Sequence, residues 1–138
     1  MKKNILLLVA ALVCLFVFVF FNKTKSNMPQ NFIVELGSCN VINQVGTPVI
    51  CFDSLITDCR CPEDVMCPWA GYAAVKLSMK YNNGSVQKFS LSTLPHTQFP
   101  PNDTTLNGYH IRLVNVFPYP NTAIPQPDKY RVELQVAY

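Results

Sequence analysis

The clearest signal in the chain is an alternation of apolar and polar residues. Residues 130–136 place Tyr, Val, Leu and Val at every second position, and residues 109–113 do the same with Tyr, Ile and Leu. This period of two is typical of strands with one buried face, and no segment shows a long helical repeat. Six segments are expected to form strands: Asn31–Gly37, Pro48–Ile56, Tyr72–Tyr81, Ser85–Thr93, Tyr109–Phe117 and Lys129–Ala137. The pattern predicts an all-β, antiparallel sandwich or barrel-like domain of about six strands.

One hairpin is specific enough to predict its register. Asn-Gly at residues 83–84 suggests a two-residue turn, but that turn would leave the apolar residues of the two strands on opposite faces. A three-residue loop over residues 82–84 instead pairs Leu77 with Phe89 and Val75 with Leu91. Because a slip of one residue moves every side chain to the other face, burial favours the second register. Gly84 is then expected in a left-handed conformation.

Two long connections separate the later strands. Residues 94–107 and 118–128 contain seven prolines between them, which excludes them from central strands. The first connection is longer than a simple link requires, so it is either a binding surface or a flap that packs Phe99 on the core.

The pattern at the N-terminus is entirely different. Seventeen apolar residues run without interruption from Ile5 to Phe21, after Lys2 and Lys3. This arrangement predicts one hydrophobic helix that serves as a signal anchor or signal peptide. No small-x-small cleavage site follows Phe21, which favours a retained anchor. Cys14 lacks the small preceding residues of a lipidation site and is expected to lie within the apolar helix.

These features divide the chain into a signal anchor or signal peptide at residues 1–25, a linker at 26–30 and an all-β extracytoplasmic domain at 31–138. The expected location is membrane-anchored, through residues 5–21, with the C-terminal domain in the periplasm or at the cell surface. Cleavage of the leader would instead yield a secreted protein.

Charge narrows the functions further. The chain has eleven Lys and Arg and eight Asp and Glu, but four of the lysines lie in residues 1–25. The remainder has seven basic and eight acidic residues and no basic stripe, so no nucleic-acid partner is expected. His96 and His110 lack the spacing of a catalytic or metal site, and each is expected to be solvated or hydrogen-bonded. No cofactor is expected.

Five of the six cysteines lie between residues 39 and 67. Beyond an export segment, disulfide formation is the expected chemistry. Cys61 and Cys67 are spaced to close a small loop, and Cys39 and Cys51 meet if the first two strands form a hairpin. Cys59 is then the odd thiol, although a bridge from Cys59 to Cys39 or Cys51 stays open if the second strand bends. The alternative is a metal-binding or thiol-redox module built on Cys59, Cys61 and Cys67, but no Cys-x-x-Cys spacing supports it.

A motif around these cysteines resembles a signature of small, uncharacterised exported bacterial proteins, many of them lipoproteins. The motif reads Asp58-x-Arg60-Cys61-Pro62-x4-Cys67-x-Trp69-x-Gly71-x-Ala73-x-Val75-x-Leu77. The resemblance implies that Cys61–Cys67 is a shared bridge. The position of Cys59 is commonly Ser in that group, and the resemblance implies no activity.

Three residues of this motif form a candidate binding surface. Trp69, the only tryptophan, is either an exposed anchor for a partner or a plug packed over the disulfide at one end of the domain. Asp58 and Arg60 either contact a ligand or pair with each other. The sequence therefore predicts a non-catalytic, membrane-tethered envelope domain, stabilised by disulfides, that binds an envelope protein or another envelope component.

Overall fold

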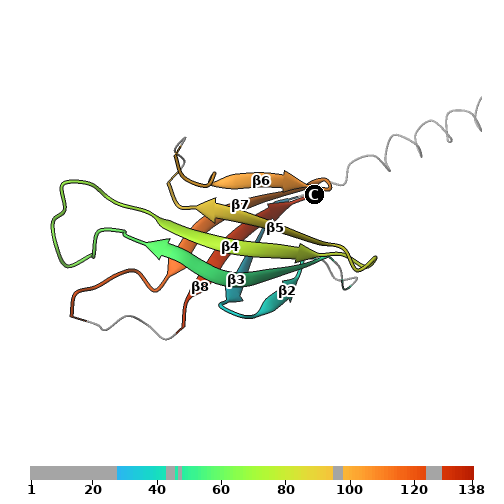
Figure 1. Cartoon of the computed structure of the whole chain (residues 1–138), viewed down its shortest axis with the longest axis horizontal. Helices are drawn as coiled ribbons and strands as arrows, with labels where there is room; N and C mark the ends of the chain where they lie inside the picture. The colour runs from blue at the N-terminus through green and yellow to red at the C-terminus, as the bar shows by residue number, and fades with distance from the viewer. Residues whose placement is uncertain (1–27, 43–45, 47, 95–97, 124–128) are drawn as a thin grey trace, which may run out of the picture.

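The structure, a computed structural model, describes residues 28–42, 46, 48–94, 98–123 and 129–138. Residues 5–21, Cys14 and His96 lie outside the described residues. Within the described part, the chain is all-β and forms eight strands (Figure 1). The strands are β1 (Gln30–Glu35), β2 (Cys39–Val41), β3 (Val49–Asp58), β4 (Ala73–Lys80), β5 (Val86–Ser92), β6 (Asp103–Leu106), β7 (Tyr109–Phe117) and β8 (Arg131–Ala137). The described residues contain no helix that is long and apolar enough to cross a membrane.

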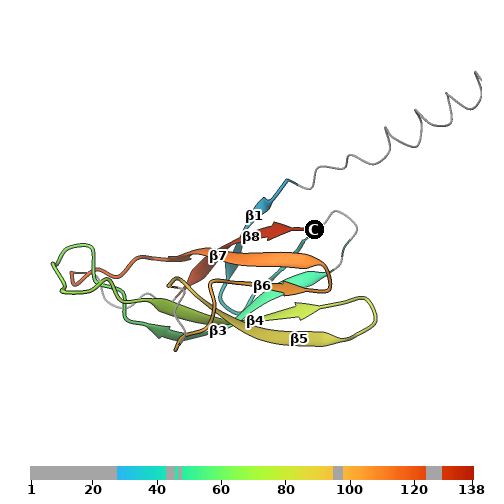
Figure 2. The same ribbon diagram turned by 90° about the horizontal axis from the view of Figure 1, so that it is seen from above.

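The strands form two four-stranded antiparallel sheets. One sheet has the order β1-β8-β7-β6 and the other the order β2-β3-β4-β5. Figure 2 shows the two sheets as separate layers. Both sheets end in edge strands, so the domain is a sandwich rather than a closed barrel. A single parallel bridge from Leu36 to Phe52 ties the end of β1 to the second sheet.

One hydrophobic core fills the space between the layers. The inward side chains of each sheet supply it, which is why the period of two in the sequence marks the strands. Twelve of its fully buried residues are Val34, Ile111, Leu113, Val132, Leu134 and Val136 from the first sheet and Ile50, Phe52, Val75, Leu77, Met79 and Leu91 from the second. The strict alternation breaks in β7, where a bulge at Val114 brings Val116 rather than Asn115 onto the core.

The predicted hairpin register is confirmed. Leu77 pairs with Phe89 and Val75 pairs with Leu91 between β4 and β5. Gly84 has a φ of +79°, the left-handed conformation that the three-residue loop requires. Burial of one face was therefore a sound guide to the pairing.

The prediction of about six strands was too low by two. β2 is only three residues long with every residue exposed, so it carries no alternation that could be recognised. β6 lies within the proline-rich connection of residues 94–107, at the edge of its sheet. The prolines do exclude a central strand there, but an edge strand needs hydrogen bonds on one side only.

The two ends of the sandwich are built differently. The connections β3–β4, β5–β6 and β7–β8 lie together at one end, as both views show (Figures 1 and 2). The β4–β5 turn lies at the other end, together with the last residues of β8 and Gln30, which pairs with Val136. Residue 28 is therefore at the opposite end of the domain from the cysteine-rich β3–β4 connection.

Candidate functional site

The cysteine-rich connection begins with a buried ion pair. The guanidinium of Arg60 donates to both carboxylate oxygens of Asp58, with Nε–Oδ1 at 2.8 Å and Nη2–Oδ2 at 2.7 Å. Each side chain is only 4% exposed. A bidentate pair of this kind fixes both position and orientation. Asp58 and Arg60 are thus brought together inside the fold rather than on its surface.

Arg60 also joins the two sheets. Its Nη1 donates to the carbonyl of Val116 at 2.6 Å, and its Nη2 donates to the carbonyl of Pro118 at 3.0 Å. The ring of Tyr119 lies over the guanidinium, 4.5 Å from its carbon to the ring centre. One side chain from the end of β3 thereby holds the end of β7 and the start of the next connection.

The segment after Arg60 is closed into a loop by the predicted disulfide between Cys61 and Cys67, whose Cα atoms are 5.9 Å apart. We call residues 61–69 the tip. The backbone N–H of Cys61 donates to the carbonyl of Ala70 at 2.8 Å, so the chain returns beside its own starting point. Gly71 then turns the chain into β4 with a φ of +65°, and a Cβ atom there would lie 1.8 Å from the carbonyl oxygen of Cys59. Only glycine fits this turn.

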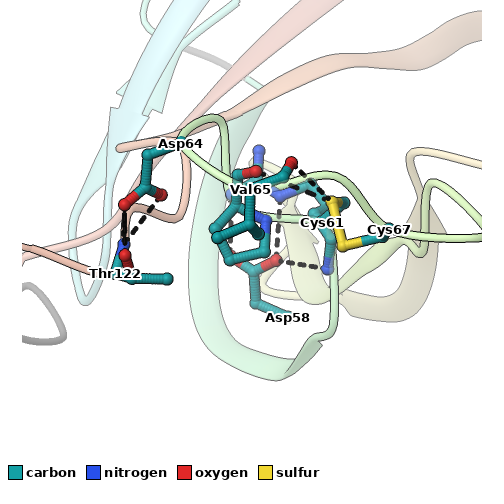
Figure 3. The surroundings of a disulfide bond; sticks show 8 residues. Asp58, Cys61, Asp64, Val65, Cys67 and Thr122 are labelled. Carbon is teal, nitrogen blue, oxygen red and sulfur yellow. Dashed lines mark hydrogen bonds and ion pairs between the residues drawn. A yellow bond between two sulfur atoms is a disulfide. The ribbon is translucent and has the colours of Figure 1, made fainter.

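The tip rests against the β7–β8 connection, as Figure 3 shows for Asp64 and Thr122. The carboxylate of Asp64 accepts from the backbone N–H of Thr122 at 2.9 Å and from its hydroxyl. The N–H of Glu63 donates to the carbonyl of Pro120 at 3.0 Å. The hydrogen bonds from Thr122 hold the pKa of Asp64 below its ordinary value of 3.8, so its negative charge persists at neutral pH.

Three large apolar side chains of the tip are exposed. Met66 is 100% exposed, Trp69 is 77% exposed and Val65 is 46% exposed. The expectation that Trp69 plugs the end of the sandwich was therefore wrong. The Arg60 network and Tyr119 lie at the base of the loop. A fixed loop that exposes neighbouring large apolar side chains is the arrangement of a contact surface.

Cys39 and Cys51 form the second predicted disulfide, directly opposite each other on β2 and β3. Among the cysteines that the structure describes, Cys59 alone keeps a free thiol. Its Sγ donates to the carbonyl of Tyr72 at 3.3 Å. With Cys61 and Cys67 joined, only one of the three sulfurs invoked for a metal or redox module remains a thiol. The described residues also contain no group of three or more His, Cys, Asp or Glu side chains placed to hold a metal ion.

His110, one of the two histidines considered in the sequence, lies far from the tip. His110 is on the outward face of β7, and its Nε2 lies 2.8 Å from Oδ2 of Asp103 on the neighbouring strand. It is hydrogen-bonded, as expected, and half-exposed. Phe99 of the first long connection contacts Tyr72, the residue before β4, with ring centres 4.0 Å apart, so that connection lies beside the start of β4.

Several members of this site carry no signal in the sequence. Met66, Asp64 and Thr122 are ordinary residues in connections, and Tyr119 has no regular spacing from Arg60. Two of the hydrogen bonds of Arg60 go to backbone carbonyls more than fifty residues away, which any residue type could supply. Only the disulfide spacing and the nearby tryptophan direct attention to the tip.

The fold and this site define a disulfide-stabilised, all-β domain with an exposed apolar loop at one end. Comparisons of the chain with protein-family models, curated proteins and solved structures find no match. The resemblance of the motif around Cys61 to exported bacterial proteins therefore stays a prediction.

Proposed function

We propose that this protein is a non-catalytic binding domain, tethered through residues 5–21 to the outer side of a membrane, that contacts an envelope protein through its tip. The observation that carries this proposal is the full exposure of Met66 and the 77% exposure of Trp69 on a loop held at its base and side. Large exposed apolar side chains on a soluble surface are a typical mark of a protein interface.

The contacts that hold the tip in place indicate a binding surface rather than an unordered loop. The disulfide, the Arg60 network and the hydrogen bonds to Thr122 order the loop before any partner arrives. Ordering the contact surface in advance reduces the entropy lost on association. Tryptophan is also among the residues that most often contribute strongly to binding.

The position of the tip agrees with a tether at the N-terminal side. The tip and residue 28 lie at opposite ends of the sandwich (Figures 1 and 2). A domain held through residues preceding Gln30 would keep the tip uncovered. The fixed carboxylates of Glu63 and Asp64 beside the apolar residues favour a partner with a basic rim around an apolar recess.

Site-specific crosslinking in the full-length chain tests this proposal. A photoreactive residue replaces Met66 in one variant and Ile33 in the control; Ile33 is an exposed apolar residue on β1, away from the tip. We expect one discrete protein adduct from position 66 in native membranes and none from position 33. Adding Trp69→Ala should abolish the adduct from position 66.

Two outcomes would contradict the proposal. The same adducts from both positions would indicate non-specific collision, and the absence of any adduct at position 66 in protein with both disulfides intact would leave the tip without a partner. An adduct that survives Trp69→Ala would move the contact surface away from the indole.

A further inference from the structure

A group of lysines lies on the outer face of the sheet formed by β2–β5. Val75, Leu77 and Met79 of β4 face the core, so Lys76 and Lys80 face outward. Lys88 of β5 pairs opposite Ser78, which lies midway between them, and is therefore the diagonal neighbour of both. Diagonal neighbours in a sheet are about 7–8 Å apart. We call Lys76, Lys80 and Lys88 the lysine face; it holds three of the four lysines in residues 31–138.

The lysine face carries a net positive charge. The contacts between basic and acidic side chains in the described residues are Arg60–Asp58 and His110–Asp103, and neither includes a lysine. Apart from Asp58, the only acidic residue in β2–β5 is Asp53, whose Oδ1 accepts from the hydroxyl of Ser78 at 2.9 Å. Because Ser78 lies between the three lysines, the Asp53 carboxylate lies among them, but one negative charge does not balance three positive charges and the face still attracts anions.

The outer face of the other sheet is arranged differently. There, His110 lies 2.8 Å from Asp103, and Glu133 accepts from the side chain of Asn31 at 3.1 Å. The guanidinium of Arg131 lies over the ring of Phe117, with 5.4 Å from its carbon to the ring centre. That face carries acidic and basic side chains side by side, whereas lysines predominate on the outer face of the β2–β5 sheet.

The lysine face also has a particular place along the domain. β4 and β8 both begin at the tip end and run away from it, so Lys80 lies near the end at which Gln30 pairs with Val136. Residues 22–29 separate the apolar segment from β1, and eight residues reach less than ~30 Å when fully extended. An apolar segment held in a bilayer would therefore keep the lysine face within reach of the membrane surface.

We propose that the lysine face lies against the anionic phospholipid headgroups of the membrane that holds the tether. This inference rests on the tether in the proposed function. Basic residues close to an anionic leaflet are attracted to it, each strengthening attachment about fivefold, which corresponds to ~1 kcal/mol. The carboxylates of Glu63 and Asp64 at the tip are repelled by the same leaflet. The two effects together orient the domain with the lysine face toward the membrane and the tip away from it.

Amine footprinting of the full-length chain tests this inference. The chain is reconstituted in vesicles of phosphatidylcholine alone, or of phosphatidylcholine mixed with phosphatidylglycerol, and labelled with an amine-reactive reagent. We expect labelling of Lys76, Lys80 and Lys88 to fall severalfold in the anionic vesicles and to recover at high salt, because salt screens the attraction. Lys129, an exposed lysine next to β8 at the tip end, is the internal control and should not change.

Vesicle flotation in the same samples separates the tether from the lysine face. Flotation with both vesicle types and equal labelling in both would overturn the lysine contact while leaving the tether intact. Flotation with neither would overturn the tether and the inference that rests on it. Flotation with anionic vesicles alone would support the lysine face and overturn the tether.

Two labelling results would also contradict the inference. Equal protection of Lys129 would mean that no specific face contacts the membrane. If inorganic phosphate protects Lys76, Lys80 and Lys88 in neutral vesicles, the face binds a soluble anion instead.

Matched variants add a second readout. The triple variant Lys76→Gln, Lys80→Gln and Lys88→Gln should remove the difference between the two vesicle types in the protection of backbone amides of β4 and β5 from hydrogen exchange. Lys129→Gln should leave that difference unchanged. All four side chains are exposed, so the substitutions leave the core intact. A difference that persists in the triple variant would overturn the inference.

Discussion

The two disulfides lie in regions of opposite construction. Cys39–Cys51 joins residues that already face each other on β2 and β3, where the backbone ladder holds the chain. Cys61–Cys67 closes a loop outside the sheets, held to the rest of the domain mainly by Arg60 and by contacts with residues 120–122. The first bridge strengthens an existing structure, whereas the second helps to create the shape of the tip. The comparison suggests that similar bonds have different effects on stability and on local order.

The largest effect should come from breaking the ion pair at the base of the tip. Asp58→Asn leaves the buried guanidinium of Arg60 without a counter-charge, which typically costs about 3–5 kcal/mol. Asp53→Asn is the matched control in the same strand, because Asp53 is exposed and accepts one hydrogen bond from Ser78. It should cost about 1 kcal/mol or less. Urea unfolding measures both, and equal losses would show that the base of the tip adds little to stability.

Removing the two disulfides one at a time distinguishes their effect on the free energy of unfolding from their effect on the local order of the tip. The cysteines are 12 residues apart in one bridge and 6 in the other. Loop-closure entropy then predicts losses of about 3 kcal/mol for replacing Cys39 and Cys51 by Ser, and about 2 kcal/mol for Cys61 and Cys67. Hydrogen exchange should show the reverse order locally, with the backbone N–H of residue 61 losing its protection only in the second variant. An unchanged melting temperature in either variant would contradict its structural role.

Two glycines test whether the exit from the tip is more constrained than an ordinary turn. Gly71→Ala places a Cβ atom 1.8 Å from a backbone carbonyl oxygen, so the chain must move in addition to bearing left-handed strain. Gly84→Ala meets no atom within 4 Å and bears the strain alone. We expect a loss of about 1–2 kcal/mol at Gly84 and a larger loss at Gly71. Thermal unfolding measures both, and equal losses would mean that the tip relaxes freely around the new methyl group.

The same contrast explains how much of the molecule was predictable. Burial dictates strand phase, so the β4–β5 register followed from the sequence, and short spacing directed Cys61 to Cys67. Pairing of Arg60 with Asp58 was one of the alternatives that the sequence offered, but the burial of the pair was not predictable, because Arg60 also bonds the backbone carbonyls of Val116 and Pro118, which only the fold brings close. The exposure of Trp69 was one of two alternatives that the sequence left open.

The lysine face shows a different limit of prediction from sequence. Read along the chain, its members are isolated single residues and form no basic stripe. They become neighbours only when β4 and β5 are paired in the observed register. The predicted register already makes them neighbours across the sheet, whereas the order of charges along the chain does not. Short strands such as β2 had no comparable signal, because all three of its residues are exposed.

The smallest predicted effect is on the hydrogen bonds between Asp64 of the tip and Thr122, and it depends on pH. The hydrogen bonds from Thr122 lower the pKa of Asp64 below 3.8, so the folded state binds this proton less readily than the unfolded chain. Their contribution is complete above the unfolded pKa and is lost as the pH falls through the lower, folded pKa. In an NMR titration the N–H resonance of Thr122 should shift with a midpoint below 3.8. Asp64→Asn keeps an acceptor oxygen but cannot titrate, so its Thr122 resonance should not move in that acid range. A midpoint for Asp64 at or above 3.8 would mean that the tip is not held against the β7–β8 connection in solution.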